Sequence, residues 1–103
     1  MASSTIERDA AKVAGDWRLN EHVRIVRRGN VVMMEVSNYP ITDTSARTNL
    51  GTLPSSELNP PFGVFAFGIS PNLSYVTVSS NGQIQGYMNV QGNLLATISW
   101  GVN

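Results

Sequence analysis

The fold of this chain is decided by residues 74–89, which read SYVTVSSNGQIQGYMN. Apolar and polar side chains alternate on both sides of Asn81-Gly82, a pattern typical of two antiparallel strands joined by a tight turn. A two-residue turn would mix apolar and polar groups on both faces, whereas a three-residue loop with a left-handed Gly82 separates them. We therefore predict a bulged hairpin in which Tyr75 lies opposite Tyr87.

The two faces of this hairpin differ in chemistry. One face is apolar and predicts the core side: Val76, Val78, Ile84, Gly86 and Met88. The other is neutral and polar, and six of its residues are candidates for ligand binding or a subunit interface: Tyr75, Thr77, Gln83, Gln85, Tyr87 and Asn89. Tyrosine rings stack on apolar surfaces, and amides and hydroxyls bond to sugar hydroxyls. Neutral groups also cost less to desolvate than charges, so we place burial against a second copy of the chain first, ahead of ligand binding and of an ordinary solvated sheet face.

Two further segments predict strand pairs that extend the sheet structure. Residues 23–36 form a hairpin around Gly29-Asn30, in a register that places Val23 opposite Val36. A turn at residues 91–93 predicts that the last strand lies beside residues 83–89 and completes a three-stranded meander. In that register Gly86 faces Ile98 and leaves room for its branched side chain.

Residues 62–69 read as another strand, with Phe65 and Phe67 on one face. The preceding connection, residues 50–61, carries prolines that exclude central strand over most of its length. Six to eight short strands in total predict an all-β fold, an antiparallel β-sandwich or jelly roll.

The N-terminal residues follow a different pattern. Ser4 and Glu7 have the spacing of a capping box, and the alanine-rich residues 10–14 favour a short N-terminal helix that ends at Gly15. We accordingly divide the chain into a helical lead or stalk end, residues 1–16, and a head domain, residues 17–103. The N-terminus has no apolar core region, so we expect no signal peptide.

Charge is distributed unevenly along the chain. Seven basic and seven acidic residues cancel in 103 residues, which gives no reason to expect nucleic acid as a partner. Every charged side chain lies at or before Glu57, so residues 58–103 carry none. Polar residues interrupt that stretch too often for membrane insertion. The chain has no cysteine, which excludes disulfides and thiolate metal sites.

Catalytic chemistry has little support in the residue pattern. The only histidine, His22, has no Cys or His companion with metal-ligand spacing. The carboxylates are scattered through predicted loops, and no nucleophile-elbow, phosphate-loop or dinucleotide motif occurs. We expect no enzyme, no catalytic residue, no metal and no cofactor; an acid–base pair assembled only by folding is the alternative left open. Four arginines are a candidate basic patch, although Glu21 and Glu35 nearby favour a partly paired sheet edge: Arg24, Arg27, Arg28 and Arg47.

Several short runs together resemble a known pattern. They are VRIVRRGNVV at residues 23–32, LGTLP at residues 50–54, Pro60-Pro61, and VTVSSNGQI at residues 76–84. Similar runs occur in the C-terminal head-type domains of phage and prophage tail-fibre or baseplate receptor-binding proteins, and the match covers roughly residues 17–102. No binding motif of that family transfers to particular positions here.

The resemblance implies a jelly-roll head assembled as a parallel homotrimer that binds host cell-surface saccharide. It also implies a place in the virion, with other tail or baseplate proteins as partners. Two alternatives stay open: a structural virion decoration or trimerisation module without a ligand, and a carbohydrate-binding module of a cell-wall hydrolase.

Overall fold

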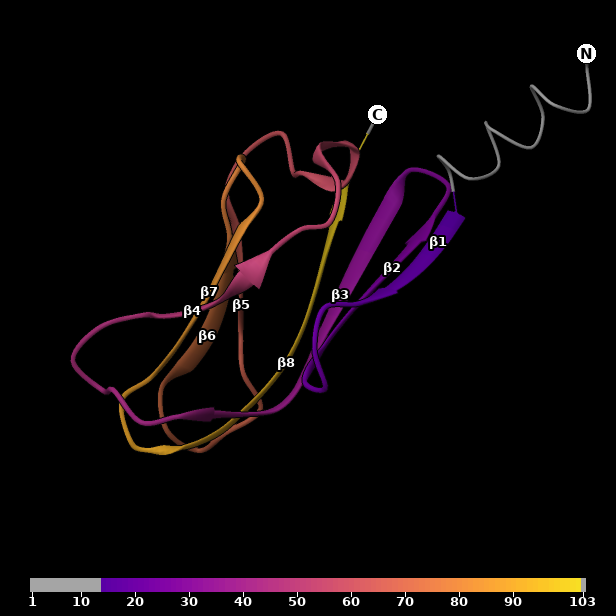
Figure 1. Ribbon diagram of the computed structural model, residues 1–103. Helices are drawn as coiled ribbons and strands as arrows, with labels where there is room; N and C mark the ends of the chain where they lie inside the picture. The colour runs from indigo at the N-terminus through magenta and orange to yellow at the C-terminus, as the bar shows by residue number, and fades with distance from the viewer. Residues whose placement is uncertain (1–13, 103) are drawn as a thin grey trace, which may run out of the picture.

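A computed structural model describes residues 14–102, which form eight β-strands and one short 3-10 helix (Figure 1). The elements are β1 (Ala14–Arg18), β2 (Val23–Arg28), β3 (Val31–Ile41), β4 (Thr48–Thr52), η1 (Ser56–Leu58), β5 (Val64–Phe67), β6 (Ser74–Val78), β7 (Gln83–Met88) and β8 (Gly92–Gly101). Strands β1, β2, β3 and β8 form sheet A, in that order, and β4, β7, β6 and β5 form sheet B. All the strand pairs are antiparallel.

The two sheets lie as two layers that share one core (Figure 1). Alternate side chains of each strand point inward, as the period of two along a strand requires. The buried core residues come from both sheets and from the connection between β4 and β5: Val23, Ile25, Val32, Met34, Val36, Ile41, Leu50, Leu53, Leu58, Val76, Val78, Ile84, Met88, Leu94, Ala96, Ile98 and Trp100. The prediction of an all-β fold built of antiparallel sheets is confirmed.

The connectivity within the two sheets differs. Sheet B has a Greek-key order, because β5, β6 and β7 follow one another by short connections while β4 lies on the far side of β7. Sheet A is a β1-β2-β3 meander to which β8 is added beside β3. A jelly roll contains two Greek keys, and the described strands contain one.

Both central hairpins have the predicted registers. Val23 lies opposite Val36 in the β2–β3 pair, and Gly29 at its turn has φ 60°, as a turn that begins with glycine requires. Tyr75 lies opposite Tyr87 in the β6–β7 pair. Gly82 has φ 89° and donates its N–H to the Ser79 carbonyl at 2.9 Å, so the three-residue bulged loop is confirmed.

The predicted place of the last strand is wrong. β8 pairs with β3 in the other sheet, in a register that places Val32 opposite Trp100 and Val36 opposite Ala96 (Figure 1). Ile98, which we predicted on the core face with Gly86, is nevertheless buried, as are the alternate residues Leu94, Ala96 and Trp100. Alternation determines which side of a strand faces the core, and because the core is shared by both sheets the same alternation serves either partner.

The N-terminal boundary also differs from the prediction. β1 begins at Ala14 and pairs with β2 throughout, so residues 14–16 are part of sheet A and the division at residue 17 falls inside a strand. The helix predicted for residues 4–14 falls almost entirely outside the described residues.

Candidate functional site

The six predicted site residues lie on or directly beside two adjacent strands of sheet B. Tyr75 is opposite Tyr87 and Thr77 is opposite Gln85, all four half-buried on the face turned away from the core. Gln83 begins β7 and Asn89 follows its last residue, and both are exposed. The hairpin register therefore brings the central four together and leaves the other two at the ends of the strand.

The two tyrosines form a ring pair whose hydroxyls bond to the segment before β4. The ring centroids are 5.4 Å apart with an interplanar angle of 31°. Tyr87 Oη donates to the Thr44 carbonyl at 2.9 Å, and Tyr75 Oη accepts a 3.2 Å hydrogen bond from Arg47 Nε. Tyr87 therefore already uses its hydroxyl to hold this segment.

Two phenylalanines extend the face onto the edge strand β5. Phe65 pairs with Thr77 and Phe67 pairs with Tyr75, so both rings stand on the face of the predicted site. Their side chains are 62% and 67% exposed, and the two rings meet edge to face at 5.5 Å. Exposed aromatic side chains that gather on one face are typical of a binding surface.

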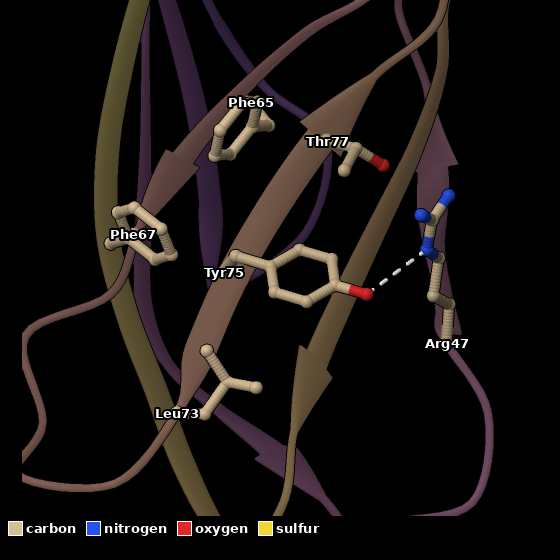
Figure 2. Close-up of a pocket in the computed structure, with 6 residues that line it drawn as sticks. All are labelled: Arg47, Phe65, Phe67, Leu73, Tyr75 and Thr77. Atoms are coloured by element: carbon tan, nitrogen blue, oxygen red, sulfur yellow. Dashed lines mark hydrogen bonds between the residues drawn. The ribbon is translucent and has the colours of Figure 1, made fainter.

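A pocket of about 320 Å³ opens between β5 and the Arg47 side chain. Figure 2 shows the six residues that line it: Arg47, Phe65, Phe67, Leu73, Tyr75 and Thr77. Only Tyr75 and Thr77 were among the predicted site residues. The outward alternation of Phe65 and Phe67 was visible in the sequence, but their position beside Tyr75 depends on the β5–β6 pairing, which no tight turn specifies.

Charge is nearly absent from this face. The four strands of sheet B contain no charged residue, and Arg47 precedes β4 directly. The Arg47 guanidinium carbon lies 5.5 Å from the centroid of the Tyr75 ring, within the range of a cation–π contact. The site is thus an apolar, aromatic pocket with a single permanent cation at its rim.

Sheet A differs from sheet B in that it carries charged side chains. Arg24 donates two hydrogen bonds to Asp16, from Nε at 3.0 Å and from a terminal nitrogen at 2.6 Å. The hydrogen bonds from Arg24 hold the pKa of Asp16 below its ordinary value of 3.8, and the positive charge of Arg24 acts in the same direction. Glu35 lies opposite Arg24 on the neighbouring strand.

The four arginines do not form the candidate basic patch. Arg27 faces the core, is buried, and donates from Nε to the Gly29 carbonyl at 2.9 Å. Arg24 is paired on sheet A, and Arg47 lies on sheet B. Arg24 pairs with Asp16 rather than with Glu21 or Glu35, and β2 is an inner strand of sheet A, so the prediction of a partly paired sheet edge is wrong as well.

His22 has local structural partners in the turn between β1 and β2. Its Nδ1 lies 2.9 Å from the Ser37 carbonyl oxygen, and its ring meets Tyr39 edge to face at 5.4 Å. Within residues 14–102, no three His, Cys, Asp or Glu side chains gather in a way that could hold a metal ion.

Comparisons of the chain with protein families, with curated proteins and with solved structures found no match. In the part of the chain that the structure describes, no helix has the length and apolar character needed to cross a membrane.

Proposed function

We propose that this chain is a non-enzymatic adhesion domain, the trimeric head of a phage tail-fibre or baseplate receptor-binding protein. In this proposal the outer face of sheet B binds host cell-surface saccharide. The sequence resemblance supports the virion context and the homotrimer. The observation that carries the binding function is the pocket beside Tyr75, whose wall is aromatic and whose strands carry no charge.

The chemistry of the pocket suits a sugar. Phe67 and Tyr75 offer flat rings on which the C–H face of a sugar can stack. Thr77 adds a neutral hydroxyl that can donate or accept. The pocket volume lies near the lower end of small-molecule sites, at about 300 Å³, which suits a single sugar ring and its substituents.

A second apolar surface, separate from the pocket, is available for contact between subunits. Phe62 and Ile69 flank β5 at its two ends, are 80% and 77% exposed, and do not line the pocket. Apolar side chains this exposed are typical of surfaces that are covered in an assembly. We assign these two residues to the contact between copies of the chain.

The second candidate function is a structural virion module in which sheet B is covered by another copy and binds no sugar. The exposure of Phe65 and Phe67 favours it, because both rings would be removed from water in such an assembly.

The two functions are separated by measuring mass and ligand retention together. Light scattering at micromolar concentration should give the mass of a trimer, and host cell-wall material should retain the protein. Tyr75→Ala should abolish retention without changing the mass, whereas Phe62→Ser with Ile69→Ser should give monomers. Thr97→Ala, exposed on the outer side of sheet A, is the matched control and should change neither.

A monomeric wild-type chain would contradict the trimer. If Tyr75→Ala itself produces monomers, the outer face of sheet B is the subunit interface and the structural module is the better account.

A further inference from the structure

We infer that the pocket on sheet B selects a saccharide that carries an anionic group, a carboxylate or a phosphate, and that Arg47 is the residue that binds it. This inference rests on the proposed function of the same face and names the class of its ligand. The observations that carry it are the position of Arg47 at the rim of the pocket and the single hydrogen bond from its Nε to Tyr75.

Arg47 is held in place by one of its nitrogens. Nε donates to Tyr75 Oη at 3.2 Å, and Figure 2 shows the guanidinium pointing toward the Tyr75 hydroxyl from the segment just before β4. A guanidinium carries five N–H donors in a rigid fork, of which only one belongs to Nε. The four donors on the terminal nitrogens match the geometry of a carboxylate or phosphate, which they bind in a bidentate manner.

The carboxylates of the described chain that have partners are bound away from Arg47. No carboxylate among residues 14–102 lies within ion-pair distance of Arg47. Asp43, the nearest acid in the sequence, accepts from the Ser45 hydroxyl at 2.7 Å and from the Ser45 N–H at 2.9 Å. Asp16 is bound by Arg24 on the other sheet. An anionic ligand would therefore supply the charge that the protein does not place beside Arg47.

The rest of the pocket limits which anions fit. Phe65, Phe67 and Leu73 form an apolar wall that a free, fully hydrated ion would not use. A ligand that joins an anionic group to a sugar ring engages both parts: the ring stacks on the aromatic wall, and the oxyanion meets Arg47. Tyr75 serves both, because its ring lines the pocket and its hydroxyl positions the guanidinium.

The test is an NMR titration of the isotope-labelled chain with three probes: glucose, glucuronic acid and glucose 6-phosphate. We expect shifts in residues 65–77 with all three probes and an affinity about tenfold higher for at least one acidic sugar at low salt. Higher salt should reduce that preference, because an exposed charge pair is screened. The carboxylate and phosphate arms identify which oxyanion the site prefers.

The variants assign the preference to Arg47. Arg47→Gln should abolish the preference, so that the variant binds the acidic sugar no more tightly than it binds glucose. Arg28→Gln removes the same charge from the exposed end of β2 in the other sheet and should retain the full preference. Tyr75→Phe keeps the ring but removes the hydroxyl that positions Arg47, so the preference should fall while glucose still binds.

The outcomes separate this inference from the proposed function. Equal affinity for glucose and both acidic sugars, or an unchanged preference in Arg47→Gln, would overturn the role of Arg47 and leave the saccharide site standing. No shift in residues 65–77 with any of the three sugars would overturn both.

Discussion

The indole Nε1 of Trp100 donates a 2.7 Å hydrogen bond to the backbone carbonyl of Leu58, and both residues are buried. Trp100 belongs to β8 of sheet A, whereas Leu58 ends η1 in the connection between two strands of sheet B. The bond therefore ties β8 of sheet A to the connection between β4 and β5 of sheet B. Without this donor the Leu58 carbonyl would be buried with no hydrogen-bond partner, because water does not reach this region.

We predict that Trp100→Phe lowers the free energy of unfolding by about 2–3 kcal/mol, because it leaves the Leu58 carbonyl unpaired and opens a cavity. Urea denaturation monitored by circular dichroism measures the change. Trp17→Phe, at the half-buried rim of the core, is the control and should cost less. A loss at position 100 no larger than that at position 17 would contradict the role of the hydrogen bond.

Gly86 makes room for Leu94, which comes from the other sheet. A Cβ added at Gly86 would lie 2.5 Å from Leu94 Cδ2 and 3.1 Å from Leu50 Cδ1. The sequence predicted the need for space at Gly86 but assigned the space to Ile98, because it placed β8 beside β7.

Gly86→Ala should therefore destabilise the fold by about 1–3 kcal/mol through overpacking. Leu94→Ala alone should cost about 2–5 kcal/mol. In the double variant the new methyl group occupies space that Leu94 has vacated, so its loss should be smaller than the sum of the two. Additive losses in denaturant titrations would show that the two positions do not compete for one space.

The two turn glycines should respond differently to the same substitution. Gly29 has φ 60° and nothing within 4 Å of an added Cβ, whereas Gly82 has φ 89° and Asn59 Oδ1 at 2.5 Å. Gly29→Ala should cost about 1 kcal/mol from its left-handed backbone alone. Gly82→Ala should cost more, because the Asn59 side chain must also move. Thermal melts of the two variants give the comparison, and equal losses would rule out the contact with Asn59.

The Asp16–Arg24 pair should contribute to the acid sensitivity of the fold. The folded-state pKa of Asp16 is depressed, so its stabilisation is present above the ordinary value of 3.8 and is lost as pH falls through the folded value. Asp16→Asn should therefore reduce the fall in melting temperature below about pH 4, and added salt should reduce it in the wild type. Identical pH profiles for wild type and Asp16→Asn would contradict this contribution.

The sequence by itself determined the all-β class, two hairpin registers and the chemistry of their faces. These properties are local: alternation sets which side chains share a face, and a glycine with positive φ sets the length of the turn, as at Gly29 and Gly82. For the same reason four of the six predicted site residues lie together in the centre of β6 and β7.

Only the tertiary structure decided which strand β8 joins and which residues complete the pocket. The buried faces of sheets A and B line one core, so the inward pattern of β8 satisfies either partner and cannot choose between them. Phe67 lies opposite Tyr75 on the next strand, but no tight turn specifies the register of that pair. Arg47 reaches Tyr75 from a segment 28 residues away, a contact that no local pattern encodes, because it forms only when β4 joins β7 in the sheet.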